Sequence, residues 1–358
     1  MRKLLMLLLT LMLLFSCALA DVLGQPVAEG AVHVDLTALK EVKSSQTDKL
    51  IAELQAIEGL QSVDLHGVYT NDKQKAALVK ALPGVDFQWT IKLAGAEIDS
   101  SVTVLDLETL VKSSTKLADI RTALNCLPHV EKVIMYKFRN SKSNMEKLLA
   151  DYPDIHFEWS VHWYICDGRV VDLRTDATCF STLKGRQDPR YTADMLMPYL
   201  QYCPDLLGID VGHNNVSDLS FLLNWPNLRR LICIDSKVPV TDLSPLAQLP
   251  DLEYIELFMQ NITDLSPLAN HTKLLDLNVC HNNITDLSPL YSCVNLERLH
   301  ISYNPNLTQE EIDKFKAVLP NCVVETETYQ STGGGWREHE RYFVIQKSFE
   351  DYVYYPFE

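Results

Sequence analysis

The sequence predicts an α/β solenoid, in which short coils of strand, turn and helix stack so that their strands form one parallel sheet. Three observations predict it: leucines recur at fixed spacing across residues 206–304, a second short motif recurs between them, and a weaker helix–strand pattern repeats across residues 21–200. Self-similarity with a period in the twenties is typical of solenoids, because each coil buries its apolar edge against the next.

Five rows of the form L-x-x-L-x-L carry the leucine pattern. The rows begin 22, 24, 22 and 22 residues apart, at Leu206, Leu228, Leu252, Leu274 and Leu296. Positions one, four and six of a row point into a shared core, and the residues between them point outward along a parallel sheet. Five rows in one register predict a leucine-rich repeat solenoid with a C-terminal cap over residues 201–326, in which Leu231, Ile255, Leu277 and Leu299 stack as a ladder.

Each row then reaches a turn with a polar side chain at one equivalent position. That side chain is asparagine at 214, 282 and 304, serine at 236 and glutamine at 260. An asparagine amide can pair with backbone groups that a bend leaves unsatisfied, so we expect these side chains to bind their own coil and its neighbour.

The second motif is TDLSPL, which follows the turn in three rows, with VSDLSFL in a fourth. Ser244, Ser266 and Ser288 are expected to act as N-caps, with the following prolines at the first helical position, where a missing N–H costs nothing. Row two has two additional residues near Lys237–Pro239, which predicts a local bulge.

These rows, with their L-x-x-L-x-L runs and TDLSPL segments, resemble the bacterial internalin-like class of leucine-rich repeat proteins. The resemblance covers about a third of the chain. It implies a curved solenoid that binds another macromolecule on its concave face, on a bacterial surface or outside the cell.

Residues 21–200 are expected to form degenerate helix–strand repeats that lead into the regular array. Three stretches that each read as an amphipathic helix, a turn and a strand align without gaps, starting at Lys49, Asp119 and Met195. A further match, at an offset of 70 residues, pairs ALVKALPGVDFQWTI with KLLADYPDIHFEWSV. A separate α/β cap domain is the alternative, because Cys166–Gly168 suggests a hairpin turn that a plain coil would not contain.

Residues 1–20 read as a signal peptide. Arg2 and Lys3 precede an apolar run that ends in Ala18-Leu19-Ala20, a small-residue cleavage site. Cleavage after Ala20 would release a secreted protein, which is the favoured interpretation. The alternative is lipidation of Cys17, which would tether the chain to a membrane.

Net charge argues against nucleic acid as a partner. The formal charge is −15, and it becomes −17 without Arg2 and Lys3, so the chain repels phosphate backbones. No basic stripe with interleaved aromatic residues offsets this charge.

Residues 327–358 form an aromatic-rich tail after the glycines at 333–335. We expect it to fold back and shield an end or the convex side of the solenoid, and docking of a partner is the alternative. The even count of eight cysteines after cleavage invites disulfides, and Cys166 with Cys179 is the best candidate pair.

No recognised catalytic motif is present, and neither a cofactor nor a metal is expected. Glu338, His339 and Glu340 are residue types that act in general acid–base catalysis, but no candidate nucleophile lies near them in the sequence. Cys280, His281 and His300 lie on neighbouring strands, where solvated side chains are far commoner than metal ligands. Trp89, Trp159 and Trp163 could form a sugar-stacking shelf, but their alternation with phenylalanines favours buried core.

The concave sheet face is the predicted partner-binding site. Apolar side chains at positions that should face water, flanked by charges, are typical of a binding patch. The predicted contacts are Arg230, Ile232, Ile234, Tyr254, Glu256, Phe258, Asp276, Asn278, Arg298, His300 and Tyr303, with Tyr254, Phe258 and Ile234 as anchors. The alternative is that the tail or the N-terminal half covers these residues.

The sequence therefore predicts an exported, non-enzymatic leucine-rich repeat protein that binds a protein or glycan through its concave face. The alternative is an envelope-associated enzyme or structural protein that uses the repeats for targeting.

Overall fold

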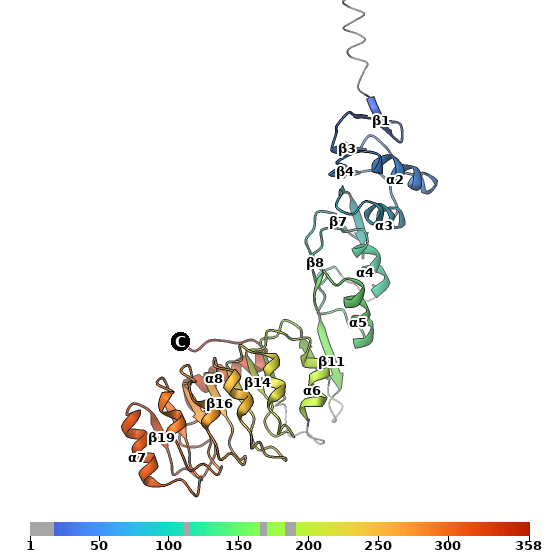
Figure 1. Cartoon of the computed structure of the whole chain (residues 1–358). Coiled ribbons are helices and arrows are strands. Elements are labelled where there is room, and N and C mark those ends of the chain that lie inside the picture. The colour runs from blue at the N-terminus through green and yellow to red at the C-terminus, as the bar shows by residue number, and fades with distance from the viewer. Residues whose placement is uncertain (1–17, 111–114, 165–169, 183–190) are drawn as a thin grey trace, which may run out of the picture. The chain divides into compact units, whose positions relative to one another are not determined.

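The computed structural model describes residues 18–110, 115–164, 170–182 and 191–358 (Figure 1). They belong to two compact units, Met1–Glu158 and Trp159–Glu358. Residues 1–17, which include most of the predicted signal peptide and Cys17, lie outside the described residues. The expected cleavage site falls in β1 (Ala18–Val22), which pairs antiparallel with β2 (Gln25–Ala28). Within the described ranges, no helix is long and apolar enough to cross a membrane.

The first unit contains two copies of one helix–strand pattern. The first copy consists of β3 (His33–Asp35), η1 (Ser44–Gln46), α2 (Thr47–Gln55), β4 (Ser62–Asp64), α3 (Asp72–Ala81), β5 (Asp86–Gln88) and the hairpin β6 (Thr90–Leu93) with β7 (Ala96–Asp99). The second copy consists of β8 (Val104–Asp106), α4 (Leu117–Leu124), β9 (Lys132–Ile134), α5 (Lys142–Asp151) and β10 (His156–Glu158). Each copy forms a three-stranded parallel sheet. Helix–strand repeats are therefore present here, but their strands form small sheets of their own and do not continue the seven-stranded sheet, which agrees with the alternative of an α/β region with its own small sheets.

A further hairpin begins the second unit. It pairs β11 (Ser160–Tyr164) with β12 (Val170–Arg174) in antiparallel register, as the hairpin signal in the sequence indicated. The predicted turn itself, Cys166–Gly168, lies outside the described residues. Trp89 and Trp159 are buried, with 1% and 3% of their surface exposed, so they belong to the core.

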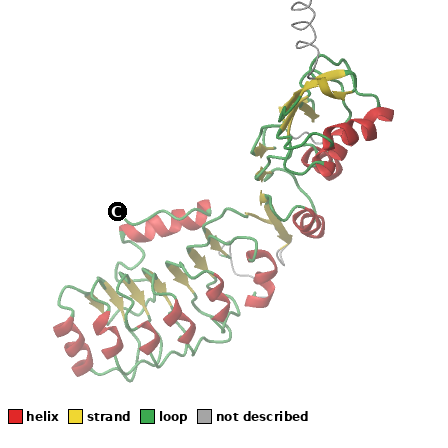
Figure 2. Ribbon diagram, turned by 45° about the horizontal axis from the view of Figure 1, so that its top comes forward, coloured by secondary structure: helices red, strands yellow, loops and turns green. Residues whose placement is uncertain are grey.

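A seven-stranded parallel sheet forms the body of the second unit. Its strands follow chain order: β13 (Cys179–Ser181), β14 (Gly208–Asp210), β15 (Arg230–Ile232), β16 (Tyr254–Glu256), β17 (Asp276–Asn278), β18 (Arg298–His300) and β19 (Val323–Glu325). The connecting helices are α6 (Ala193–Leu200), η2 (Ser220–Asn224), η3 (Ser244–Gln248), η4 (Ser266–Leu268), η5 (Ser288–Ser292) and α7 (Gln309–Val318). Figure 2 shows these helices together on one side of the strands.

The predicted leucine ladder is present. Leu231 pairs in register with Ile255, Ile255 with Leu277, and Leu277 with Leu299. None of the four side chains is more than 1% exposed. Each coil therefore covers the apolar edge of the next, which is the physical basis of a leucine-rich repeat solenoid.

The polar residues at the turns bind neighbouring coils as expected. Asn282 donates from Nδ2 to the carbonyls of Val279 and Cys280 in its own coil and of Leu257 in the preceding coil. Its Oδ1 accepts the backbone N–H of Ile262, also in the preceding coil. Asn304 repeats most of this pattern, and Gln260 takes the same role in its row. These side chains satisfy buried backbone groups that the bends leave unpaired.

The N-cap prediction for the TDLSPL motif is wrong, because the serine is the first residue of each short helix and the proline is therefore the second. The short helices are 3₁₀ helices, and the capping oxygen belongs to the aspartate, not to the serine. Asp264 accepts the backbone N–H of Ser266 at 2.8 Å and its hydroxyl at 2.7 Å. Asp242 and Asp286 receive the same backbone bond from Ser244 and Ser288. The serine is the first residue of the helix, so its side chain turns back as a donor to an Asx-type turn.

Seven cysteines of the described chain carry free, buried thiols: Cys126, Cys179, Cys203, Cys233, Cys280, Cys293 and Cys322. Cys179 is among them, which corrects its expected pairing with Cys166, a residue outside the described ranges. Burial raises the pKa of six of these thiols to about 12, and that of Cys293 to about 11. They remain protonated and therefore poorly nucleophilic.

Candidate functional site

The chain's own tail, residues 327–358, covers the concave face of the seven-stranded sheet, which is the face opposite the connecting helices. Its helix α8 (Glu340–Asp351) packs against β13 and β14, on the side of the strands opposite the short helices (Figure 2). The backbone N–H groups of Thr178 and Cys179 donate to the carbonyl of Tyr352, so the tail also joins the first strand. The tail was expected to shield an end or the convex side, and the structure places it on the concave side instead.

An apolar cluster joins the tail to the sheet. From the sheet it contains Cys179, Ile232, Ile234, Tyr254, Phe258 and Cys280, and from the tail Trp336, Ile345 and Phe349. All nine residues are buried, and six of them are at most 2% exposed. Such burial contributes roughly 1.5–3 kcal/mol for each large side chain, so this cluster is a main source of tail binding.

Two arginines of the tail reach buried carboxylates on the sheet. Arg341 donates from Nε and Nη2 to the two carboxylate oxygens of Asp276, each at 2.8 Å. Arg337 donates from Nη2 to Glu256 at 2.8 Å. Glu256 also accepts the indole N–H of Trp336 at 2.8 Å. Both carboxylate side chains are fully buried, so their charges depend on these tail residues for compensation.

Two arginines of the sheet reach back to the tail. Arg230 is fully buried and donates to the Ser348 hydroxyl at 2.9 Å and to the Tyr355 carbonyl at 2.5 Å. Its guanidinium lies 4.1 Å from the ring centre of Phe357, within cation–π range. Arg298 donates to the carbonyl of Trp336 at 2.9 Å and lies over its ring at 4.3 Å.

Asp210 is the buried acid that the tail leaves without an arginine. It accepts the Ser181 hydroxyl at 2.9 Å and the backbone N–H of Gly212 at 3.0 Å. Burial raises the pKa of Asp210 to about 7. His300 has the opposite shift, because burial lowers its pKa to about 4, and its Nε2 lies 3.1 Å from the Ser302 hydroxyl.

All eleven predicted partner contacts therefore lie at the boundary between the sheet and the tail. Nine of them are buried and Arg298 is partly buried, because the tail fills the surface that was expected to be free. Arg230, Glu256, Asp276, Asn278 and Arg298 bind the tail through hydrogen bonds. Ile232, Ile234, Tyr254 and Phe258 pack in the shared apolar cluster, and His300 lies beside Trp336. Their use by an external partner stays a prediction.

Tyr303 is the predicted contact that remains exposed, at 47%. It belongs to a row of residues just beyond the strands, the strand-exit rim, which consists of His213, Asp235, Met259, His281 and Tyr303. All five have positive φ, between 45° and 59°. This backbone region is uncommon for residues other than glycine. It turns the backbone N–H of each of the first four rim residues toward a carbonyl of the next coil, as His281 does toward Ser302 at 2.9 Å.

One end of the rim carries an aromatic patch. The rings of His281 and Tyr303 stack at 4.5 Å with an interplanar angle of 5°. Tyr329 of the tail meets Tyr303 edge-on at 5.2 Å, and its carbonyl lies 2.9 Å from His281 Nε2. Met259, on the same rim, is 46% exposed and Tyr329 is 72% exposed. This patch presents apolar surface to solvent while the tail is in place.

The residues considered for chemistry have other roles in the described chain. His339 is the N-cap of α8 and accepts the backbone N–H of Arg341. Among the described residues, no group of three or more His, Cys, Asp or Glu side chains is placed to hold a metal ion. Cys280 instead lies in the apolar cluster, and His281 and His300 lie beside Tyr329 and Trp336.

Sequence reasoning missed the tail residues that bind the sheet: Trp336, Arg337, Arg341 and Phe349. A signal for them was present, because outward strand positions carry Asp210, Glu256 and Asp276 while the tail carries two arginines beside aromatic residues. Acidic positions on a sheet face and basic positions in a nearby tail indicate complementary surfaces.

Comparisons with known proteins agree with the repeat architecture. A family model described as leucine-rich repeats (2 copies) matches residues 272–316. No curated protein matches the sequence at a significant level.

Solved structures of leucine-rich repeat proteins are similar to the chain at low sequence identity. Internalin C2 of Listeria monocytogenes is 23% identical over 40% of this chain and 80% of its own, with a TM-score of 0.28. Internalin F of the same organism is 18% identical over 82% and 68%, with a TM-score of 0.33. A leucine-rich repeat protein of Leptospira interrogans is 13% identical over 80% and 75%, with a TM-score of 0.32. The family match over residues 272–316 and the in-register ladder together show that the chain contains leucine-rich repeats.

Proposed function

We propose that this chain is an exported, non-enzymatic leucine-rich repeat protein that binds a protein partner. Leucine-rich repeats commonly serve protein interaction, and the acidic surface favours solubility and basic partners. The observation that carries the proposal is the exposed aromatic patch of Met259, His281, Tyr303 and Tyr329. Exposed aromatic and methionine side chains gathered at one place are typical of binding hot spots.

The patch also explains how the predicted concave site and the tail can both belong to the function. Tyr303 comes from the solenoid and Tyr329 from the tail, so the closed chain forms one surface from both. The ten other predicted contacts hold the tail in place, and they become available only when the tail leaves the sheet.

Replacement of Tyr303 and Tyr329 together by alanine tests this proposal. Tyr303 is 47% and Tyr329 72% exposed, and their ring contacts are with each other and with His281 at the surface, so the melting temperature should change by only a few degrees. Loss of two hot-spot rings should weaken partner binding by about tenfold or more. Phe343→Ala is the matched control, because Phe343 is a comparably exposed aromatic residue, at 58%, on helix α8 of the same tail. Binding is measured by quantitative capture of partners from culture medium and cell envelopes.

The result distinguishes the two surfaces. Equal capture by the parent and the double variant would contradict a role for the patch. Capture that appears only in Arg341→Ala, a variant that weakens tail binding, would assign the partner to the concave residues instead. Protease or glycosidase treatment of the captured material separates a protein partner from a glycan, the alternative that the sequence left open.

Export has a separate test. The mass of the mature chain, purified from its native source, should correspond to an N-terminus at Asp21. A mass that corresponds to a lipid-modified Cys17 would place the protein on a membrane surface, and an intact Met1 would contradict export.

A further inference from the structure

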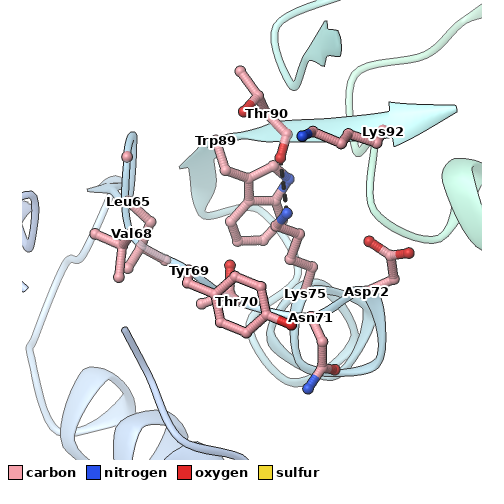
Figure 3. A pocket seen from close by; sticks show the side chains of 11 residues that line it. Leu65, Val68, Tyr69, Thr70, Asn71, Asp72, Lys75, Trp89, Thr90 and Lys92 are labelled. Carbon is pink, nitrogen blue, oxygen red and sulfur yellow. Dashed lines mark hydrogen bonds between the residues drawn. The ribbon is translucent and has the colours of Figure 1, made fainter. Parts of the chain in front are cut away.

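A cavity in the first unit is lined by two buried polar side chains, Lys75 and Thr70, that make fewer hydrogen bonds than they can. It has a volume of about 490 Å³ and lies between the loop after β4, the first turns of α3 and strand β6 (Figure 3). Its walls include Leu65, Val68, Tyr69, Thr70, Lys75 and Trp89. This volume is within the range of small-molecule sites.

Lys75 is the first of these groups. Its side chain is 6% exposed, and its ammonium group donates to the backbone carbonyl of Thr90 at 2.7 Å (Figure 3). Nζ also lies 6.0 Å from the centre of the Trp89 ring. No carboxylate among the described residues lies within ion-pair distance of it, although Asp72 also lines the cavity. A lysine ammonium has three N–H donors, so two of them remain for a ligand.

Thr70 is the second group. It is 6% exposed, and its hydroxyl has no hydrogen-bond partner among the residues that the structure describes. A buried hydroxyl without a partner is costly, and native proteins rarely leave one unsatisfied. Thr70 and Lys75 both line this cavity, so both side chains lie beside a group bound there.

The surroundings indicate which chemistry fits. An ammonium without a hydrogen-bonded carboxylate favours an anion. Desolvation lowers the pKa of Lys75, and the negative charge of Asp72 offsets this shift only in part. Lys92 adds a second positive charge at the exposed edge, where it pairs with Glu97 at 3.5 Å. Asp72 repels negative charge on any ligand, so a ligand with one negative charge fits this cavity better than one with two. Leu65, Val68 and the rings of Tyr69 and Trp89 suit an apolar or aromatic body.

We propose that this cavity binds a small monocarboxylate with an apolar or aromatic body, whose carboxylate accepts hydrogen bonds from the Lys75 ammonium and the Thr70 hydroxyl. The site lies in the first unit, separate from the sheet and tail of the second. It gives the helix–strand repeats a ligand-binding role that does not depend on partner binding by the solenoid.

The test uses 4-fluorobenzoate as the probe and the full chain as the protein. Fluorine NMR should show binding with a dissociation constant of about 1–10 mM, as expected for a fragment of ten heavy atoms. Lys75→Met should weaken binding about tenfold or more, and Thr70→Val by a smaller factor. Lys80→Met, an exposed position on the same helix, is the matched control and should bind as the parent does.

The neutral probe 4-fluorobenzamide should bind at least about tenfold more weakly, because it lacks the charge that Lys75 compensates. Protection gives a second measurement that needs no variant. With 4-fluorobenzoate present, reductive methylation of Lys75 in the parent chain should slow while that of Lys80 should not. Equal binding of the amide, equal binding by Lys75→Met, or unchanged methylation of Lys75 at saturating probe would each overturn the proposal, as would no binding at all.

Discussion

Replacement of Arg341 by alanine should open the tail without unfolding the solenoid. Arg341 supplies two of the hydrogen bonds to the carboxylate of Asp276, whose side chain is fully buried. Without it, the nearest cation is Arg298, with Nη1 at 3.7 Å. Removal of one partner from a buried ion pair costs about 3–5 kcal/mol, since the remaining charge stays desolvated. At about 1.4 kcal/mol per tenfold, the population of the open tail should rise by a factor of roughly 10² to a few times 10³.

Two cysteines report this opening directly. Cys179 and Cys280 lie under the tail in the apolar cluster, whereas Cys233 is also buried but lies outside that cluster, with its sulfur near the carbonyl of Val216. Pulsed alkylation of the native protein, followed by mass spectrometry of the peptides, measures each thiol separately. In Arg341→Ala, labelling of Cys179 and Cys280 should accelerate by the factor given above, while that of Cys233 should stay at the parent rate.

The control is Lys347→Ala, on the same helix. Lys347 is 63% exposed and pairs with Asp351 at 2.5 Å, so its loss should change labelling by less than about twofold. Unchanged labelling of Cys280 in Arg341→Ala would refute the view that this ion pair holds the tail. Parallel acceleration at Cys233 would mean that the coils unfold together with the tail.

Three further predictions concern the solenoid, all measured by urea unfolding. Asp210 holds a proton in the folded state up to a pKa of about 7, so its stabilising contribution is complete below about pH 4 and is lost as pH rises through 7. The parent should therefore lose up to about 4 kcal/mol of unfolding free energy between pH 4 and pH 8 that Asp210→Asn does not lose. If the variant and the parent differ in unfolding free energy by the same amount at pH 4 and at pH 8, this prediction is wrong. Asn282→Ala should cost about 3 kcal/mol, because it leaves buried backbone groups of two coils unpaired. Asp264→Ala should lower the unfolding free energy by about 1 kcal/mol, because the helix loses its cap, and Ser266→Ala should lower it by less. A larger loss in Ser266→Ala than in Asp264→Ala would show that the serine is the cap.

Local periodicity explains why the solenoid itself could be predicted. The leucine rows, the turn asparagines and the 70-residue offset each depend on residues close in sequence or equivalent between coils. Leu277 could be placed in a ladder because its neighbours repeat it at fixed spacing. The motif predicts a cap at Ser266 because it resembles the start of an α-helix, whereas the helix is 3₁₀ and begins at that serine, so Asp264 accepts the hydrogen bond.

Periodicity could not predict that the tail covers the concave face. Arg341 meets Asp276 across 65 residues of sequence, and Arg337 meets Glu256 across 81. No repeat relates these partners, so periodicity carries no information about them. An outward position such as Tyr254 looks the same in sequence whether it faces a partner or the chain's own tail.

The helix–strand repeats of the first unit have a consequence for how such a chain can change in length. Strands β4 and β9, helices α3 and α5, and strands β5 and β10 are each offset by 70 residues. A deletion or duplication of that size would join a strand to its own counterpart and leave every apolar contact with a substitute. A deletion of another size that joined two strands or two helices out of register would place side chains on the wrong face. Such a chain can therefore become longer or shorter by whole 70-residue repeats.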